Sequence, residues 1–215
     1  MTARLLEGNG AAFVRERSLA AAVQRSIERV YLLEENECVG GFLEAARDGE
    51  REALFVREAG DGTIELSVRV PALGRRDIDV VRDGDLDPLC QLIEGVSHFV
   101  YVAERARADR ETTQLELELQ AEIDKYVVLA GSLARFDEAK SAALRDRLFE
   151  AVVFAHDAQS DEGERYRVAN GLARRYVRRL EREYVAARRY DGMRDELRRF
   201  YRMGQEEKLR VARAA

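Results

Sequence analysis

The chain has 215 residues, with 36 Lys and Arg against 41 Asp and Glu and a formal net charge of −5. That length suits one domain with a full core or two smaller domains, and a hydrophobic content of 46 % argues against disorder throughout. No run approaches the roughly 18 apolar residues of a membrane span, and the start lacks a signal-peptide pattern, so we expect a cytoplasmic protein with no membrane partner. Cys38 and Cys90 form no Cys-x-x-Cys pair, and we expect both thiols to be reduced.

The N-terminal part has the pattern of a helix followed by strands. Apolar residues recur with a period near 3.6 from residue 11 to residue 31, which predicts an opening helix. From residue 63 to residue 70 apolar and polar residues alternate, as in a strand with one buried face. Gly60-Asp61-Gly62 before it predicts a hairpin turn. Together with this strand, three further segments predict a three- or four-stranded antiparallel meander: 39–45, 53–58 and 77–82.

The remainder is expected to be helical. Asp87-Pro88 is typical of an N-cap followed by proline in the first turn, so a helix is predicted to begin there. Further helices are expected from Thr112 or Thr113, from near Ser141 and from near Glu164, with a turn at 190–192 and a last helix from Met193 to about Lys208. The predicted class is α+β, with an N-terminal helix and small antiparallel meander in residues 1–86 and a helical bundle ending in a helical hairpin in residues 87–215.

Charge is distributed unevenly along the chain. Residues 164–213 carry 16 Lys and Arg against 8 Asp and Glu, whereas the preceding 163 residues carry the other 20 basic and 33 acidic residues. On the predicted helix from Glu164 the arginines gather opposite the apolar face, where like charges one turn apart repel by about 0.2–0.5 kcal/mol per pair. Such a ridge indicates an anionic partner outside the helix.

We therefore expect a non-enzymatic interaction or adaptor protein of a cytoplasmic assembly, which docks the arginine ridge on an acidic protein surface or another subunit. The predicted docking residues are Arg174, Arg175, Arg178, Arg179, Arg182, Arg188 and Arg189. The same residues, with the nearby rings of Tyr190, Phe200 and Tyr201, also suit the phosphates and bases of a nucleic acid. The net negative charge disfavours that alternative. No phosphate-binding glycine-rich loop and no Cys/His zinc spacing are present, so no cofactor is predicted.

A second alternative is a metal-dependent enzyme of the helical bundle, either a hydrolase or a protein with a carboxylate-bridged metal site. Glu94 and His98 lie one turn apart, as do Glu118 and Glu122, and two such pairs on adjacent helices would form a carboxylate and histidine ligand set. The spacing differs from the Glu-x-x-His of di-iron bundles. Glu94 and His98 lie opposite the apolar stripe of their helix, so we expect them to be solvated unless a second layer covers them.

Glu122 and the two residues His156-Asp157 complete the set of candidate residues. Glu122 falls within an apolar stripe, where we expect Lys125, Tyr126 or an arginine of the tail to pair with it. His156-Asp157, with His98 before it and Asp191 or Asp195 after it, resembles the ligand pattern of all-helical metal phosphohydrolases. The chain has only two histidines, so that pattern carries little weight.

Overall fold

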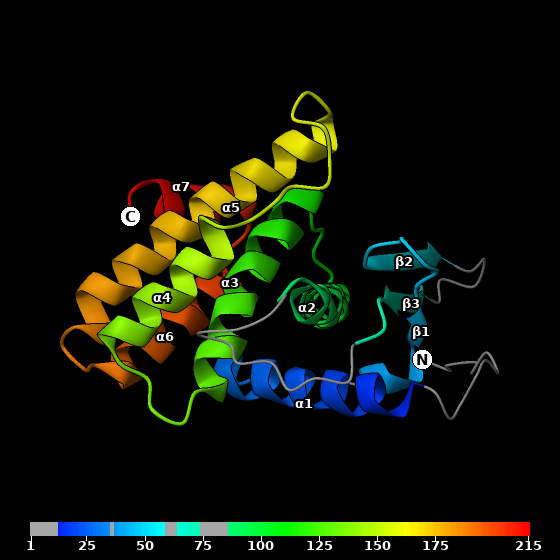
Figure 1. Ribbon diagram of the computed structural model, residues 1–215, viewed down its shortest axis with the longest axis horizontal. Coiled ribbons are helices and arrows are strands. Elements are labelled where there is room, and N and C mark those ends of the chain that lie inside the picture. Colours follow the sequence, from blue (N-terminus) through cyan, green and yellow to red (C-terminus); the bar gives the residue numbers. More distant parts are fainter. Residues whose placement is uncertain (1–12, 35–36, 59–63, 74–85) are drawn as a thin grey trace.

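The computed structural model describes residues 13–34, 37–58, 64–73 and 86–215. Figure 1 shows a small sheet on one side, a helical bundle on the other, and helix α2 (Asp87–Arg107) between them. The α+β class and the order of helix, strands and bundle are thus confirmed. No helix in the described part of the chain combines the length and the apolar character needed to cross a bilayer.

The opening helix and the strands follow their predicted patterns. Helix α1 spans Val14–Tyr31 and buries one face that includes Val23 and Ile27. A short 3₁₀ turn, Val39–Gly41, leads into strand β1 (Leu43–Ala45), and strands β2 (Ala53–Glu58) and β3 (Ile64–Val70) follow. On β3 the side chains of Leu66, Val68 and Val70 are buried, as the alternation of the sequence predicts.

The sheet is mixed, so the prediction of a purely antiparallel meander is wrong in its connectivity. The strand order is β1-β3-β2, and β1 pairs with β3 in the parallel direction. Strands β2 and β3 pair in the antiparallel direction, with Leu54 opposite Val68. A parallel pair needs a crossover, and here β2 is the intervening segment. The predicted turn at 60–62 and the predicted strand at 77–82 lie outside the described residues.

The bundle begins close to the predicted positions. Helix α3 (Gln114–Ser132) is capped by Thr113, whose side chain accepts a hydrogen bond from the Glu116 N–H. Helix α4 (Glu138–Phe149) is capped by Asp137. Helix α5 (Asp161–Leu180) is capped by Ser160. Helices α4 and α5 each begin three residues before the predicted start, because the side chains of Asp137 and Ser160 accept hydrogen bonds from the first free N–H groups.

The end of the chain differs from the prediction. Helix α5 continues into a π-helical turn, Glu181–Val185, and the chain reverses before Tyr190, with Arg188 in the left-handed region at φ 54°. Tyr190, Asp191 and Gly192 form the first turn of helix α6 (Tyr190–Arg202) rather than a loop. The predicted last helix is also broken after Arg202, and helix α7 (Gln205–Arg213) packs back on α5.

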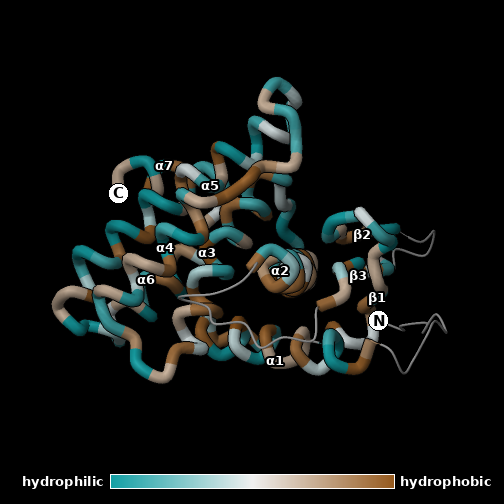
Figure 2. The backbone as a smooth tube through the Cα atoms, viewed as in Figure 1, coloured by the Kyte–Doolittle hydropathy of each residue, from teal (hydrophilic) through white to brown (hydrophobic). Residues whose placement is uncertain are grey.

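A continuous apolar core runs across the boundary that the sequence suggested at residue 86. It joins Ile27 of α1 and Val68 of β3 to Phe99 of α2 and Leu119 of α3. Arg198 of α6 donates a hydrogen bond to the Val30 carbonyl of α1, which ties the tail to the first helix. Figure 2 shows hydrophobic and hydrophilic residues alternating along α1. The division into residues 1–86 and 87–215 stays a prediction.

Candidate metal centre

Two neighbouring helices, α2 and α3, bring three of the predicted carboxylate and histidine residues together. Glu94 and His98 of α2 and Glu118 of α3 each offer a ligand atom, and these atoms lie within 4.8 Å of one another. In the part of the chain that the structure describes, no other group of three such side chains is found. Glu122 stands one turn beyond Glu118 on α3 but does not belong to this group. Three of the four residues predicted as a ligand set thus meet in space.

The expectation that Glu94 and His98 are solvated is wrong. Both residues are buried, with 7 % and 6 % of their surface exposed. The second layer that covers them is the small sheet, which packs against α2 through β3. Gly95 permits this approach, because a Cβ at its position would lie 2.8 Å from Val68 Cγ1 and 3.0 Å from Glu52 Cγ. The polar face of α2 is buried because the sheet and the segment before β2, which carries a carboxylate of its own, pack on it.

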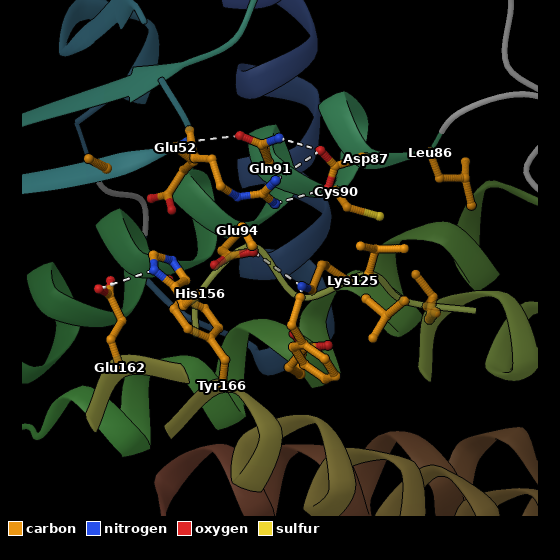
Figure 3. Close-up of a pocket in the computed structure, with 18 of the residues that line it drawn as sticks. Glu52, Leu86, Asp87, Cys90, Gln91, Glu94, Lys125, His156, Glu162 and Tyr166 are labelled. Atoms are coloured by element: carbon orange, nitrogen blue, oxygen red, sulfur yellow. Dashed lines mark hydrogen bonds and ion pairs between the residues drawn. The ribbon is translucent and has the colours of Figure 1, made fainter. Parts of the chain in front are cut away.

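That carboxylate belongs to Glu52, which the sequence did not single out. Its side chain is 5 % exposed, and its Oε1 lies 3.3 Å from His98 Nδ1. The segment before β2 is held on the first turns of α2, since the Glu52 N–H donates to Gln91 Oε1 and Arg51 donates two hydrogen bonds to Asp87 (Figure 3). Glu52 and His98 are 46 residues apart, and no local pattern links them.

His98 is oriented as a metal ligand would be. When His98 is neutral and its Nδ1–H donates to Glu52, Nε2 carries the lone pair and lies on the side of Glu118. Nε2 is buried and has no hydrogen-bond partner in the described part of the chain; it lies 3.9 Å from Glu118 Oε2, which is too long for a hydrogen bond. Ligand atoms that share one ion at about 2.0–2.2 Å stand roughly 3–4.3 Å apart. The gap is therefore of the size that an ion would fill.

Lys125 pairs with Glu122, as one of the three predicted options had it. Its Nζ lies 2.7 Å from Glu122 Oε1 and 3.2 Å from Glu94 Oε2. A more distant cation is Arg165, whose Nε lies 3.9 Å from Glu118 Oε1. Four buried glutamates with Lys125 and Arg165 leave two negative charges when His98 is neutral. That excess is costly in a buried site unless a further cation or protons offset it.

The titration behaviour reflects this excess. Burial raises the pKa of Glu118 to about 7, and His98 offsets only part of that effect. Burial also raises the pKa of Glu52 and of Glu122 above the usual range. Burial by itself would lower the pKa of His98, but the nearby carboxylates of Glu52, Glu118 and Glu94 have the larger effect and raise this pKa to about 9. Without another cation, protons therefore supply the missing positive charge.

A pocket of about 890 Å³ opens beside this cluster. Its lining includes Glu52, Glu94, Glu122 and Lys125, together with the ring of Tyr166 from α5. Figure 3 shows Glu94 and Lys125 joined across the pocket and Tyr166 below His156. The volume falls within the usual range for small-molecule sites. The cluster is thus buried but borders a space large enough for a ligand.

The His156-Asp157 pair takes no part in the cluster. His156 stacks on Tyr166, with ring centroids 5.1 Å apart, and its Nδ1 lies 3.2 Å from a Glu162 carboxylate. Asp157 accepts a hydrogen bond from the backbone N–H of Gln159. Asp191 and Asp195 form ion pairs within their own helix. The structure therefore gives no support to the phosphohydrolase pattern, because each of these residues contacts a neighbour in its own segment instead.

The seven predicted docking arginines lie along α5 and the turn after it, and several have counter-charges. Glu150 pairs with both Arg174 and Arg178. Arg179 pairs with Glu196 of α6 and Glu183, and Arg182 lies 3.9 Å from Glu183. The Arg189 guanidinium lies over the ring of Tyr184. Arg175 and Arg188 are exposed, with no carboxylate within 4.0 Å among the described residues. The ridge is partly neutralised.

A second buried polar network lies on the opposite side of α3, and no sequence pattern predicted it. Asp124 accepts hydrogen bonds from Ser97, Tyr31 and Gln120. Lys208 of α7 is fully buried, and its Nζ donates to the Tyr101 hydroxyl and to Gln120 Oε1, each at 2.7 Å. This network ties the first and last helices to the centre of the bundle.

Comparison of the chain with protein-family models, with curated proteins and with solved structures gave no match. The candidate site is therefore defined by the geometry of this chain alone.

Proposed function

We propose that the protein is a metal-dependent enzyme whose centre is a divalent transition-metal ion held by Glu94, His98 and Glu118. The observation that carries this proposal is the buried Nε2 of His98, which has no hydrogen-bond partner among the described residues, lies 3.9 Å from Glu118 Oε2 and belongs to a side chain grouped with Glu94 and Glu118. One imidazole and two carboxylates suit zinc, iron or manganese. Three protein ligands leave coordination positions open, as in catalytic rather than structural sites.

Charge and orientation support the same centre. A dication would offset the two uncompensated negative charges of the glutamate cluster. Glu52 would serve as the carboxylate that holds the imidazole in one tautomer, a role that carboxylates often have beside histidine ligands. The reaction class that fits is hydrolysis, because an ion held in part by Glu94, which lines the pocket, would act as a Lewis acid beside it.

Metal analysis tests the proposal. The purified protein is freed of metal and then reconstituted at pH 8.5 with zinc, manganese, iron(II) or cobalt(II), and we expect one tightly bound equivalent of at least one of them. The cobalt form should show visible absorption from its nitrogen and oxygen ligands. His98→Gln and Glu118→Gln are each expected to lower the metal affinity by at least a hundredfold.

His156→Gln is the matched control, because the chain has only these two histidines. It removes the partly exposed ring that stacks on Tyr166 and should leave metal uptake unchanged. Circular dichroism checks that each variant is folded. Failure of all four metals to bind in stoichiometric amount to the folded protein, or equal affinity in His98→Gln and His156→Gln, would refute the proposal.

A second proposal concerns the arginine ridge, which we propose as the docking surface of an adaptor for an acidic protein. It is favoured by Arg175 and Arg188, which are exposed and face no carboxylate within 4.0 Å in the described chain. Among the described residues outside α5 and the turn after it, the carboxylates that reach the ridge are Glu150 and Glu196 of α6. The acidic body therefore leaves part of the ridge available to a partner.

Charge reversal tests this surface. A partner identified by affinity purification should be lost from the triple variant Arg175→Glu, Arg178→Glu, Arg182→Glu, while Arg210→Glu, an exposed arginine of α7, should retain it. Retention by the triple variant would contradict the docking role. A steep loss of affinity for duplex DNA with rising salt would instead favour the nucleic-acid alternative.

A further inference from the structure

Part of the wall of the pocket is apolar. Leu86 and Cys90 at the start of α2 and Leu148 near the end of α4 contribute to it. The segment Ala151–Ala155, between α4 and α5, continues this wall to the surface, and Figure 2 shows it as a hydrophobic stretch. Val153 is 89 % exposed, Val152 is 39 % exposed, and Phe55 of β2 is 45 % exposed. Apolar side chains thus run from the interior of the pocket to its rim.

This apolar segment is held in place by specific contacts. Arg167 of α5 donates to the His156 carbonyl, and its guanidinium lies over the ring of Phe154. The Asp157 carbonyl approaches Gly163 so closely that a Cβ there would lie 1.8 Å from it. Exposed apolar residues fixed beside a pocket are typical of a surface that receives an apolar ligand.

The floor of the pocket offers a hydrogen-bond donor for an oxygen atom. Lys125 Nζ has three N–H groups, and the described residues accept two of them, at Glu94 Oε2 and Glu122 Oε1. Lys125 also lines the pocket, so its third N–H is available to a ligand there. Glu94 is shared between Lys125 and the proposed metal group. A ligand oxygen beside Glu94 would therefore meet both the ammonium and the ion.

We infer that the pocket binds an acyl compound with a hydrocarbon chain, with its carboxylate or carbonyl oxygen at Lys125 and the ion and its chain along the apolar wall toward Val152. The inference rests on the proposed metal centre. With the ion present, the glutamate cluster and its cations sum to zero charge, so an oxygen head group is not repelled. Without it, the same cluster would favour an amine head group.

Calorimetric titration of the full chain, freed of metal or reconstituted, tests the inference with butanoate, hexanoate and octanoate as probes. Octylamine has the chain of octanoate with the opposite charge. In the metal-loaded protein we expect affinity to rise about fourfold for each added methylene group. Octanoate should bind at least tenfold more tightly than octylamine, and removing the metal should reverse that preference.

Two variants locate the chain. Val152→Asp at the rim should lower octanoate affinity at least tenfold and leave metal uptake intact, whereas Val14→Asp, which changes an exposed apolar residue of α1, should change neither. Affinity independent of chain length, equal or tighter binding of octylamine to metal-loaded protein, or an unchanged Val152→Asp variant would each overturn the inference.

Metal uptake is measured separately, so the two proposals fail in distinguishable ways. A protein that loads metal but does not bind octanoate would retain the metal centre and lose the acyl ligand. A protein that loads no metal but binds octanoate with the expected chain-length dependence and the Val152→Asp defect would lose the metal centre and retain the apolar part of the pocket ligand.

Discussion

Gly95→Ala should separate the effect of helix propensity from the effect of close packing at the candidate centre. The new Cβ would lie 2.8 Å from Val68 Cγ1 and 3.0 Å from Glu52 Cγ. Ordinary carbon contacts are about 3.5–4.0 Å, so the sheet must retreat from α2 by roughly 0.5–1 Å. Crowding of this kind costs about 1–3 kcal/mol, and alanine returns up to about 1 kcal/mol of helix propensity. We expect a net loss of up to about 2 kcal/mol.

The retreat would also affect Glu52. Its contact with His98 Nδ1 is already 3.3 Å long and would extend beyond hydrogen-bonding distance. Loss of such a supporting carboxylate typically lowers metal affinity 10- to 100-fold. Cobalt affinity is measured by competition with a chelator, and the free energy of unfolding by urea denaturation of the metal-free protein.

Gly131→Ala in α3 and Gly171→Ala in α5 are the matched controls, because no atom of the described residues lies within 4 Å of a Cβ at either position. Both should gain stability and keep the metal affinity of the wild type. If Gly95→Ala gains as much stability as these controls and binds cobalt equally well, then the close approach of sheet and helix does not position Glu52, and the reasoning fails.

Three further outcomes are expected from the rest of the molecule. Burial lowers the pKa of Lys208 to about 7, so between pH 7 and 10 the ammonium loses its proton in the folded protein but keeps it in the unfolded chain. The free energy of unfolding, relative to that of Lys208→Met, should therefore rise with pH by up to about 1.4 kcal/mol per pH unit in this range. A difference in urea denaturation that does not change with pH would contradict the lowered pKa. Asp124→Asn replaces an acceptor of three buried hydrogen bonds and should destabilise the protein by about 2–4 kcal/mol in the same assay, whereas a loss below about 0.5 kcal/mol would show that the network contributes little. Gly163→Ala places a Cβ 1.8 Å from the Asp157 carbonyl, so limited proteolysis should cleave the segment before α5 faster than in the wild type, and an unchanged cleavage rate would mean that this contact does not hold the segment.

Local patterns predicted most of the elements. Helical spacing located α1, and the polar caps Thr113 and Ser160 mark helix starts that the sequence placed within a few residues. The turn at the end of the chain was misplaced because Tyr190-Asp191-Gly192 suits a turn locally, whereas the structure turns earlier and uses these residues to begin α6. Gly192 lies against the ring of Tyr184 there, a tertiary contact that no local pattern contains.

Of the candidate site, the sequence by itself determined the pairs of side chains one turn apart on α2 and α3, because helical geometry fixes which residues share a face. Only the tertiary structure decided that these faces meet, that the sheet buries Glu94 and His98, and that Glu52 reaches His98 from 46 residues away. Strand order and the direction of β1 were likewise decided at that level. Burial and charge pairing depend on which element lies across from a face, and that choice belongs to the packing of the whole chain.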